Sequence, residues 1–285
     1  PTKRMRHSYK QHHQIKPVKS LGQNFLTDPN IAQKIVDLLD AQADDMLIEI
    51  GPGEGALTKL LVTTPAKVHA VEFDRRAVEY LKINYPADLF PNFELFGGDI
   101  RKFPIAEFSK EQVAKTGRKP KVIGNIPYNI TSDILFLLFD NAAHIDRAVI
   151  TMQKEVAERI VAKLRTKDYG ILTVAAAFVS KPHIAMNIAP ECFYPKPKVD
   201  SAVVVFEFGE PMLTPERFKK VMPIVRAGFN QRRKMLSNSL KSVLPADESL
   251  VSEIASAYFN KRAEELTPED FIRISDTIRS VVSPV

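Results

Sequence analysis

The segment Gly124–Tyr128 holds the residue types and spacing best suited to chemistry. It follows a short apolar run that predicts a β-strand, and ligands of α/β proteins bind beyond the carboxyl ends of strands. The side-chain oxygen of Asn125, with the carbonyl of Ile126 or Pro127, could accept both N–H bonds of an exocyclic adenine amine and so localise its lone pair on nitrogen. Tyr128 offers a face for stacking an extruded base. We therefore predict adenine N6 methylation by orientation and electrostatics, with no strong general base. A turn with a packed tyrosine is the alternative.

A glycine-rich turn, Glu49–Gly55, follows an earlier predicted strand and leads into a predicted helix. Glycines let such a turn bend sharply and approach a ligand closely. Glu72 lies 21 positions after Gly51, where a carboxylate can hold the ribose hydroxyls of an adenine nucleoside. The alternatives are a structural turn and a surface carboxylate paired with Arg75 or Arg76.

The residues within the turn favour one nucleoside cofactor over another. A dinucleotide pyrophosphate needs free backbone N–H groups and no neighbouring negative charge, but Pro52 removes one N–H and Glu54 adds a charge. S-adenosylmethionine carries a sulfonium cation and no phosphate, so the turn favours it. Asp99 ends the third predicted strand and could accept a hydrogen bond from the cofactor's adenine amine, unless it only caps a loop.

Strand-like and helical stretches alternate along most of the chain, which predicts an α/β fold with a doubly wound, Rossmann-like parallel sheet. Expected strands are 46–50, 68–73, 93–96, 122–124, 148–152, 171–179 and 202–208, and expected helices are 31–39, 56–62, 75–83, 132–139 and 154–164. Asp28 and Pro29 fit the N-cap and first position of the first helix. The polar stretch 104–120 is interpreted as a surface insertion.

Three parts are expected along the chain: a basic tail over 1–19, a methyltransferase domain over 20–210, and a smaller all-helical domain over 211–285. The chain has 285 residues and a net charge of +6, which makes a polyanionic partner plausible. The single cysteine, Cys192, excludes an intrachain disulfide and a cysteine-rich zinc site. No apolar stretch approaches the roughly 20 residues of a membrane span. We expect a cytoplasmic monomer with no membrane partner and no bound metal.

Two basic regions are candidates for contacts to RNA phosphates. The tail over 1–19 has six lysines and arginines and no acidic residue, and it is either a solvated tail or an RNA-contacting arm. Between Glu216 and Asp247 every charged residue is positive. We take Arg232, Arg233 and Lys234 as the RNA-binding candidates of the helical domain, with a merely solvated face as the alternative.

Several segments together resemble the ribosomal RNA adenine N6,N6-dimethyltransferase family, over nearly the whole chain after about residue 17. Besides Glu49–Gly55 and Asn125–Tyr128, the matching segments are Lys19–Leu26, Met152–Ala157, Phe193–Val203 and Phe229–Lys234.

The resemblance implies roles that the residues alone do not establish. It places cofactor contacts on Asn24, Leu26, Gly51, Glu72, Asp99 and Asn125, with Lys19–Leu26 covering the cofactor. The target adenine would lie between Tyr128 and Phe193, although Phe193 alone fits a core aromatic. The implied substrate is a pair of adjacent adenosines in a hairpin near the 3′ end of small-subunit ribosomal RNA, dimethylated during ribosome biogenesis.

Two other functions stay open on this scaffold. One is a transcription or ribosome-assembly factor that has lost methylation, which the intact Glu72, Asn125, Pro127 and Tyr128 argue against. The other is a relative that modifies large-subunit RNA and confers antibiotic resistance. The Phe193–Val203 segment and the long helical end favour the small subunit.

Overall fold

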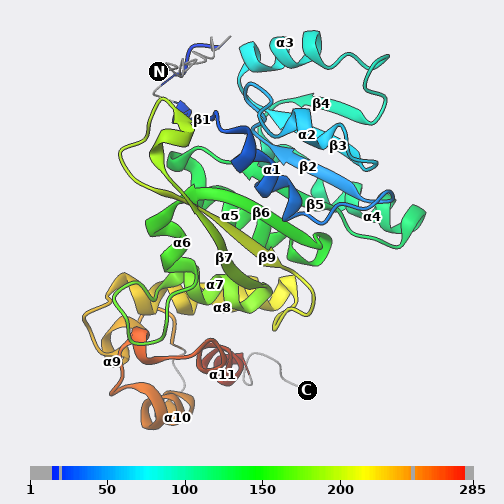
Figure 1. The fold of residues 1–285 in the computed structure, drawn as a ribbon. Coiled ribbons are helices and arrows are strands. Elements are labelled where there is room, and N and C mark those ends of the chain that lie inside the picture. Colours follow the sequence, from blue (N-terminus) through cyan, green and yellow to red (C-terminus); the bar gives the residue numbers. More distant parts are fainter. Residues whose placement is uncertain (1–14, 19–20, 245–247, 280–285) are drawn as a thin grey trace.

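A computed structural model describes residues 15–18, 21–244 and 248–279 of the chain (Figure 1). Its main element is a seven-stranded sheet with strand order β4-β3-β2-β5-β6-β9-β7. The strands are β2 (Met46–Ile50), β3 (Lys67–Glu72), β4 (Phe93–Gly97), β5 (Lys121–Asn125), β6 (Arg147–Gln153), β7 (Lys181–Ile188) and β9 (Ser201–Glu207). The first five in the order are parallel, whereas β9 is antiparallel to both β6 and β7. The predicted α/β class with a doubly wound sheet is confirmed.

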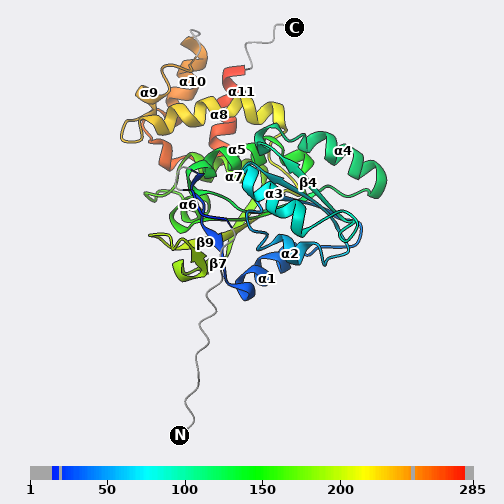
Figure 2. The ribbon, with the colours of Figure 1, turned by 90° about the horizontal axis from the view of Figure 1, so that it is seen from above.

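Helices cover both faces of this sheet (Figure 2). They are α1 (Pro29–Asp37), α2 (Thr58–Leu61), α3 (Arg75–Asn84), α4 (Ile105–Thr116), α5 (Thr131–Asp140), α6 (Lys154–Ile160) and α7 (Ile171–Val179). Successive strand residues point to opposite faces, so Leu47 joins the core beneath α1 and α2, and Ile48 joins the core beneath α4, α5 and α7. Buried on both sides, the central strands are apolar at nearly every position.

The N-cap of α1 follows the sequence expectation closely. The Asp28 carboxylate accepts hydrogen bonds from the backbone N–H groups of Asn30 and Ile31, at 2.8 and 3.1 Å, and Pro29 is the first helical residue.

A second, two-stranded sheet joins β1 (Phe25–Leu26) to β8 (Phe193–Tyr194) in antiparallel register. The side-chain hydroxyl and backbone N–H of Thr27 also donate to the Cys192 carbonyl, at 3.0 and 2.8 Å. The N-terminal segment is thereby fixed to a loop about 170 residues later in the chain.

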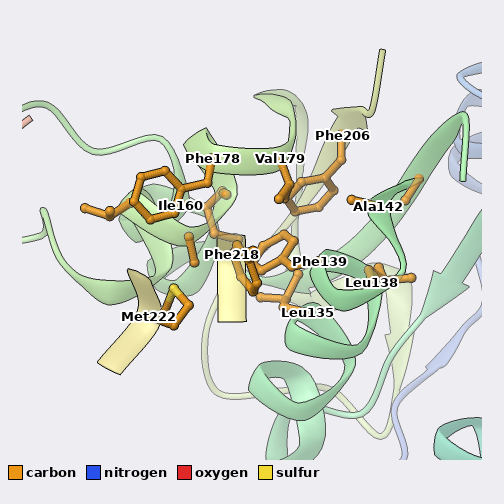
Figure 3. Packing of buried hydrophobic residues seen from close by; sticks show 14 of the residues in the cluster. Leu135, Leu138, Phe139, Ala142, Ile160, Phe178, Val179, Phe206, Phe218 and Met222 are labelled. Atoms are coloured by element: carbon orange, nitrogen blue, oxygen red, sulfur yellow. The ribbon is translucent and has the colours of Figure 1, made fainter. Parts of the chain in front are cut away.

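The described residues after Pro215 form helices: α8 (Pro215–Asn230), α9 (Leu236–Ser239), α10 (Glu248–Tyr258) and α11 (Pro268–Arg279). Their core is continuous with that of the sheet (Figure 3). Phe218 of α8 contacts Phe178 of α7 edge-on, with ring centroids 6.3 Å apart. A helical domain starting at residue 211 stays our proposal, and its core is shared with the larger domain.

The strand predicted over 171–179 is wrong, because this segment is the helix α7. A continuous apolar run cannot be assigned to a buried strand or a buried helix by its periodicity. The helix is apolar all round because it lies between the sheet and the C-terminal helices. Three consecutive alanines favour the helix, and Thr173 ties its first turn to the Gly170 N–H and the Arg159 carbonyl.

The surface insertion predicted over 104–120 is also wrong. Residues 105–116 form α4, the crossover that the parallel strands β4 and β5 require. Ile105 and Phe108 pack on the core, and the Gln112 side chain donates to the Asp44 carbonyl. Lys110 and Lys115 lie exposed on this helix, and they contribute to the polar character of the segment.

The basic tail predicted over 1–19 lies outside the described residues except for 15–18. Those residues are fixed over the glycine-rich turn: the Ile15 N–H donates to Glu54 at 2.8 Å, and Arg76 donates to the Lys16 carbonyl at 2.9 Å. Within the described ranges, no helix is long and apolar enough to cross a membrane.

Candidate active site

Asn125 is the last residue of β5, at the carboxyl edge of the sheet. Its side-chain NH2 donates to the backbone carbonyl of Asn24, at 2.9 Å. A carbonyl can only accept, so this contact fixes which way the amide points. The Asn125 Oδ1 atom receives no hydrogen bond from the described residues, and the residue lines a cavity. The orientation is the one that an acceptor for an amine requires.

The backbone contacts of the next two residues indicate which carbonyl can be the second acceptor for the amine. The Pro127 carbonyl already accepts from the Ile130 N–H at 3.2 Å and from the Thr131 hydroxyl at 3.3 Å. The Ile126 carbonyl accepts no hydrogen bond from the described residues, so it is the better of the two predicted candidates.

Tyr128 begins a short 3-10 helix, Tyr128–Ile130, and lines the same cavity as Asn125. Its hydroxyl is 2.6 Å from the Ser201 hydroxyl, which is fully buried at the start of β9. Burial raises the pKa of the Tyr128 phenol. The phenol therefore stays neutral at physiological pH, and its hydrogen bond to Ser201 fixes the position of the ring.

Phe193 lies in a different environment. Its side chain is 4% exposed and belongs to the core with Ile188 and Val203. Its backbone pairs with Leu26 across the small sheet, beside the cavity, but its ring is not among the cavity-lining residues. The structure therefore brings the backbone of Phe193 close to the site and leaves its stacking on the target adenine as a prediction.

The glycine-rich turn after β2 has the backbone that its composition predicts. Gly51 and Gly53 have φ of +63° and +58°, in the left-handed region that favours glycine. A Cβ atom on Gly53 would lie 2.9 Å from the Phe25 ring, so the turn also needs glycine for space. Phe25 of β1 covers the turn, with Leu26 and Asn24 along the cavity wall.

Glu72, the last residue of β3, is 7% exposed, so it is not the surface carboxylate that the sequence left open. Its two oxygens accept from the backbone N–H groups of Gly53, at 3.0 Å, and Asp74, at 2.7 Å. The neighbouring Arg76 pairs with Asp74 instead. Burial raises the pKa of Glu72, while the two hydrogen bonds oppose that rise. Glu72 thus holds the glycine turn to the next strand as well as lining the cavity.

Asp99 follows β4 at the cavity edge, and both sequence interpretations describe part of what it does. It caps a turn by accepting from the Arg101 N–H at 2.9 Å, and it forms an ion pair with the Arg101 guanidinium at 2.6 Å. These contacts hold the pKa of Asp99 below its usual value. The carboxylate also lines the cavity, where it can accept from a cofactor amine.

Two adjoining cavities share Gln23, Gly51, Glu72 and Pro127. The first follows the carboxyl ends of β2, β3 and β4, from Ile50 to Asp99. The second leads past Glu49 to Asn125 and Tyr128. All but one of the predicted cofactor and catalytic residues therefore line one continuous site, Phe193 being the exception.

Sequence reasoning missed three residues of this site. Glu49 is 1% exposed, its carboxylate accepts a hydrogen bond from the Thr58 hydroxyl at 2.7 Å, and burial raises its pKa to about 8. The Gln23 side-chain NH2 donates to the Asp74 carboxylate at 2.9 Å, which links the N-terminal segment to the residues after β3. The Arg101 guanidinium donates to the Asp99 carboxylate. Glu49 stood inside the glycine motif, and its place on a fully buried strand was the signal that could have identified it.

The lining suits a cation with an adenosine group. Glu49, Glu72, Asp74 and Asp99 contribute carboxyl groups, whereas Arg101 is the one basic residue among the lining residues of either cavity. The N–H groups of Gly51 and Gly53 are already bonded to Val71 and Glu72, so they are not available to a pyrophosphate. The residues present fit S-adenosylmethionine.

The three RNA-binding candidates are placed differently from one another. Arg233 and Lys234 are exposed after the end of α8. Arg232 is half-buried and forms an ion pair with Glu264 at 3.0 Å.

A sheet with five parallel strands, a glycine turn after β2, an acid at the end of β3 and a set of hydrogen-bond acceptors at the end of β5 defines an S-adenosylmethionine-dependent methyltransferase of the Rossmann-like class. The family model described as ribosomal RNA adenine dimethylase matches residues 14–280. The chain belongs to this family.

Similar proteins agree with that assignment. Ribosomal RNA small subunit methyltransferase A of Salinibacter ruber is 40% identical over 274 residues, covering 95% of this chain and 88% of the relative. The protein of the same name from Syntrophus aciditrophicus is 39% identical over 273 residues, covering 93% and 95%.

Two solved structures share the fold. A dimethyladenosine transferase from Plasmodium falciparum has a TM-score of 0.74 at 25% identity, covering 88% of this chain and 95% of that one. The 23S rRNA methyltransferase ErmE has a TM-score of 0.61 at 26% identity, covering 90% and 99%.

Proposed function

We propose that this protein dimethylates the N6 amines of two adjacent adenosines in a hairpin near the 3′ end of small-subunit ribosomal RNA, with S-adenosylmethionine as methyl donor. It acts on the assembling small subunit in the cytoplasm, as a monomer. The names of the relatives from Salinibacter ruber and Syntrophus aciditrophicus support the small subunit as the target.

The observation that carries the proposal is the orientation of Asn125. The Asn24 carbonyl holds its NH2 group, which leaves the Oδ1 atom free to accept at the cavity that Asn125 and Tyr128 line. Oδ1 and the Ile126 carbonyl provide two acceptors for the two N–H bonds of one adenine amine. Accepting both bonds returns electron density to the nitrogen and fixes its direction of attack.

The cofactor supplies a methyl group on a positively charged sulfur, and the chain's own residues do the rest. Glu72 and Asp99 would hold the ribose and the adenine, and Glu49 lines the cavity that leads to Asn125. The Tyr128 ring, fixed through Ser201, provides one face for the target base. The amine becomes strongly acidic as it forms its new bond, so its proton can pass to water.

The test is methyl transfer from labelled cofactor to undermethylated small subunits and, separately, to large subunits. We expect N6,N6-dimethyladenosine at two adjacent positions of the small-subunit RNA, located by the primer-extension stops that dimethylated adenines cause. Asn125→Ala is the inactive control. Label in the large subunit alone, or unlabelled RNA with cofactor bound normally, would overturn the proposal.

A further inference from the structure

Arg101 is the one basic residue among the described residues that line the two cavities, and two acids hold it. Its backbone N–H donates to Oδ1 of Asp99 at 2.9 Å, and its Nη2 atom donates to Oδ2 at 2.6 Å. Its Nε–H is shared between the same two oxygens, at 3.0 Å each. Its Nη1 atom lies 3.9 Å from Oδ2 of Asp133. Arg101 thus connects the residues after β4 with the first turn of α5, and all three residues line the same cavity.

The contacts with Arg101 restrict what the Asp99 carboxylate can do. The Asp99 side chain is 18% exposed, although that of Arg101 is 60% exposed. The hydrogen bond from Arg101 is the largest cause that lowers the pKa of Asp99, so the carboxyl group is ionised and can only accept. A carboxylate offers about four lone-pair directions, and the three N–H groups of Arg101 leave about one of them for a ligand. Asp99 therefore presents a single acceptor in a fixed orientation.

The same cavity has largely apolar walls around this acceptor. Ile100, Ile130 and Ile134 line it, and so does Phe73, whose side chain is 66% exposed. Apolar walls bind the flat faces of different purines about equally well. Selectivity among purines must therefore come from the polar groups that meet the edge of the ring.

A 6-aminopurine and a 6-oxopurine differ at that edge. Adenine carries an amine on C6, which donates a hydrogen bond. Hypoxanthine carries an oxygen on C6, which accepts, and its donor is one ring position away, on N1. A carboxylate that rotates freely can follow the donor from one position to the other. A carboxylate that is fixed at C6 cannot, and its oxygen then faces the oxygen of the ligand, which is a repulsive contact.

We propose that Arg101 is a positioning residue that fixes the Asp99 carboxylate and thereby makes the cofactor cavity specific for a 6-aminopurine nucleoside. This inference rests on the proposed function, which places the adenine of the cofactor at Asp99, and it adds the residue that sets the selectivity. Asp133 restrains the guanidinium from α5. Its contribution is smaller, because this pair is 3.9 Å apart and both side chains are 60% exposed.

The test measures the affinities of the full-length protein for S-adenosylhomocysteine and for its 6-oxo analogue, S-inosylhomocysteine, by competition calorimetry. We expect the wild type to prefer the 6-amino ligand by about 100-fold or more, since a site built around one donor rejects an analogue that lacks it. In Arg101→Met, this preference should fall to about tenfold or less, because the released carboxylate can turn to the donor on N1. A merely structural role would weaken both ligands equally and leave their ratio unchanged.

Lys102→Met is the matched control. Lys102 is exposed and its charge also lowers the pKa of Asp99, but it is not among the residues that line the cavity. The control removes the same charge without the hydrogen bonds, so its preference should stay within about twofold of wild type. Asp133→Asn should lower the preference by about two- to threefold.

Two further variants keep the test decisive if Arg101→Met does not fold. Arg101→Lys keeps the charge and loses the planar fork, so its preference should lie between those of the wild type and Arg101→Met. Asp99→Asn presents an NH2 group that can donate to the oxygen on C6, so it should lose most of the preference. Thermal unfolding of each variant shows whether it is folded.

The outcomes separate this inference from the proposed function. A wild-type preference in folded Arg101→Met or Arg101→Lys overturns the inference, and so does an equal loss of affinity for both ligands. A variant that keeps the preference but binds RNA more weakly also overturns it, because Arg101 would then contact phosphate. A wild-type preference in Asp99→Asn overturns it together with the place proposed for the adenine. A wild-type protein that selects the 6-amino ligand but methylates no ribosomal RNA contradicts the proposed function alone.

Discussion

The cofactor cavity and the residues that follow α8 hold their charges in opposite ways. In the cavity, Glu72 is 7% exposed and both of its oxygens are bonded to backbone N–H groups. After α8, Arg233 and Lys234 are exposed and without ion pairs among the described residues. A buried, bonded charge acts through its position, so no neighbour can replace it. Exposed charges act through their sum, so each can be lost at moderate cost.

Asn125→Ala should give the largest effect, because it removes an acceptor from the reacting nitrogen itself. We expect methyl transfer to fall about 100- to 1000-fold, as when one preorganised polar group is removed from other active sites. Single-turnover rates at saturating cofactor and RNA measure the loss. Asn141→Ala, at the far end of α5, is the control. Near-normal turnover in Asn125→Ala would contradict amine activation.

Glu72→Gln should weaken cofactor binding and the fold together. One of its two backbone partners would then face a side-chain NH2 group instead of an oxygen, which leaves a buried donor unsatisfied at a cost of about 1–3 kcal/mol. We expect Kd for S-adenosylmethionine to rise more than tenfold by calorimetry, with lower stability in urea. The exposed Glu79→Gln should change neither. A purely ligand-binding Glu72 would leave the free energy of unfolding untouched.

The pH dependence of cofactor binding tests Glu49. Burial raises the pKa of its carboxyl from 4.5 to about 8, so its contribution to stability is present below pH 4.5 and is lost as the pH rises through about 8. A bound sulfonium favours the ionised form. Affinity for S-adenosylmethionine should therefore increase by about tenfold from pH 6 to pH 8, with proton release.

In Glu49→Gln, this pH dependence should be absent. S-adenosylhomocysteine lacks the sulfonium charge, so its affinity should vary less with pH in the wild type. Calorimetry in buffers of different ionisation enthalpy measures the protons released. Equal pH profiles for the two ligands would show that Glu49 does not respond to the sulfonium.

Tyr128→Phe should have a small effect, because it keeps the ring and loses only the hydrogen bond to Ser201. Such a bond contributes about 0.5–1.5 kcal/mol, so we expect activity within about tenfold of wild type. Ser201→Ala breaks the same bond, and the double variant should be no worse than either alone. Tyr128→Ala should lose roughly 1–3 kcal/mol of stacking. An inactive Tyr128→Phe with normal binding would indicate a step that needs the phenol.

Arg232→Met should give the smallest effect, on stability. The ion pair with Glu264 is about one third exposed, which limits its contribution to about 1 kcal/mol. Arg233→Met should change the free energy of unfolding by less than about 0.5 kcal/mol. Urea titrations of the two variants measure the difference. Equal stabilities would mean that the ion pair between Arg232 and Glu264 does not stabilise the fold.

Six of the seven strands of the main sheet were predictable, because periodicity, glycines and caps act locally, whereas β7 was not predicted. Asp28 and Gly51 border a regular element whose own pattern is clear, and Glu72 and Asn125 end one. The carboxyl ends of parallel strands meet at one edge, so placing the strands also placed these side chains near one another.

The features that could not be predicted from the sequence depend on contacts between distant segments. No residue close to Arg232 in the sequence indicates that its guanidinium pairs with the Glu264 carboxylate and donates to the Thr166 carbonyl. The helix α7 is as apolar as a buried strand, and its position between two layers explains why it is apolar on every side. Phe193 was assigned by resemblance to a stacking role, while the ring itself packs in the core.

The pairing of β1 with β8 has a consequence for the timing of assembly during synthesis. Phe25 and Tyr194, its register partner, are separated by nearly the whole length of the larger domain. A contact of such high sequence separation closes late in folding, after the loop entropy has been offset by other contacts. A ribosome must therefore release the segment around Tyr194 before the cover over the glycine turn can form. The nascent chain cannot enclose its cofactor, and so cannot modify RNA, until most of the protein has been made.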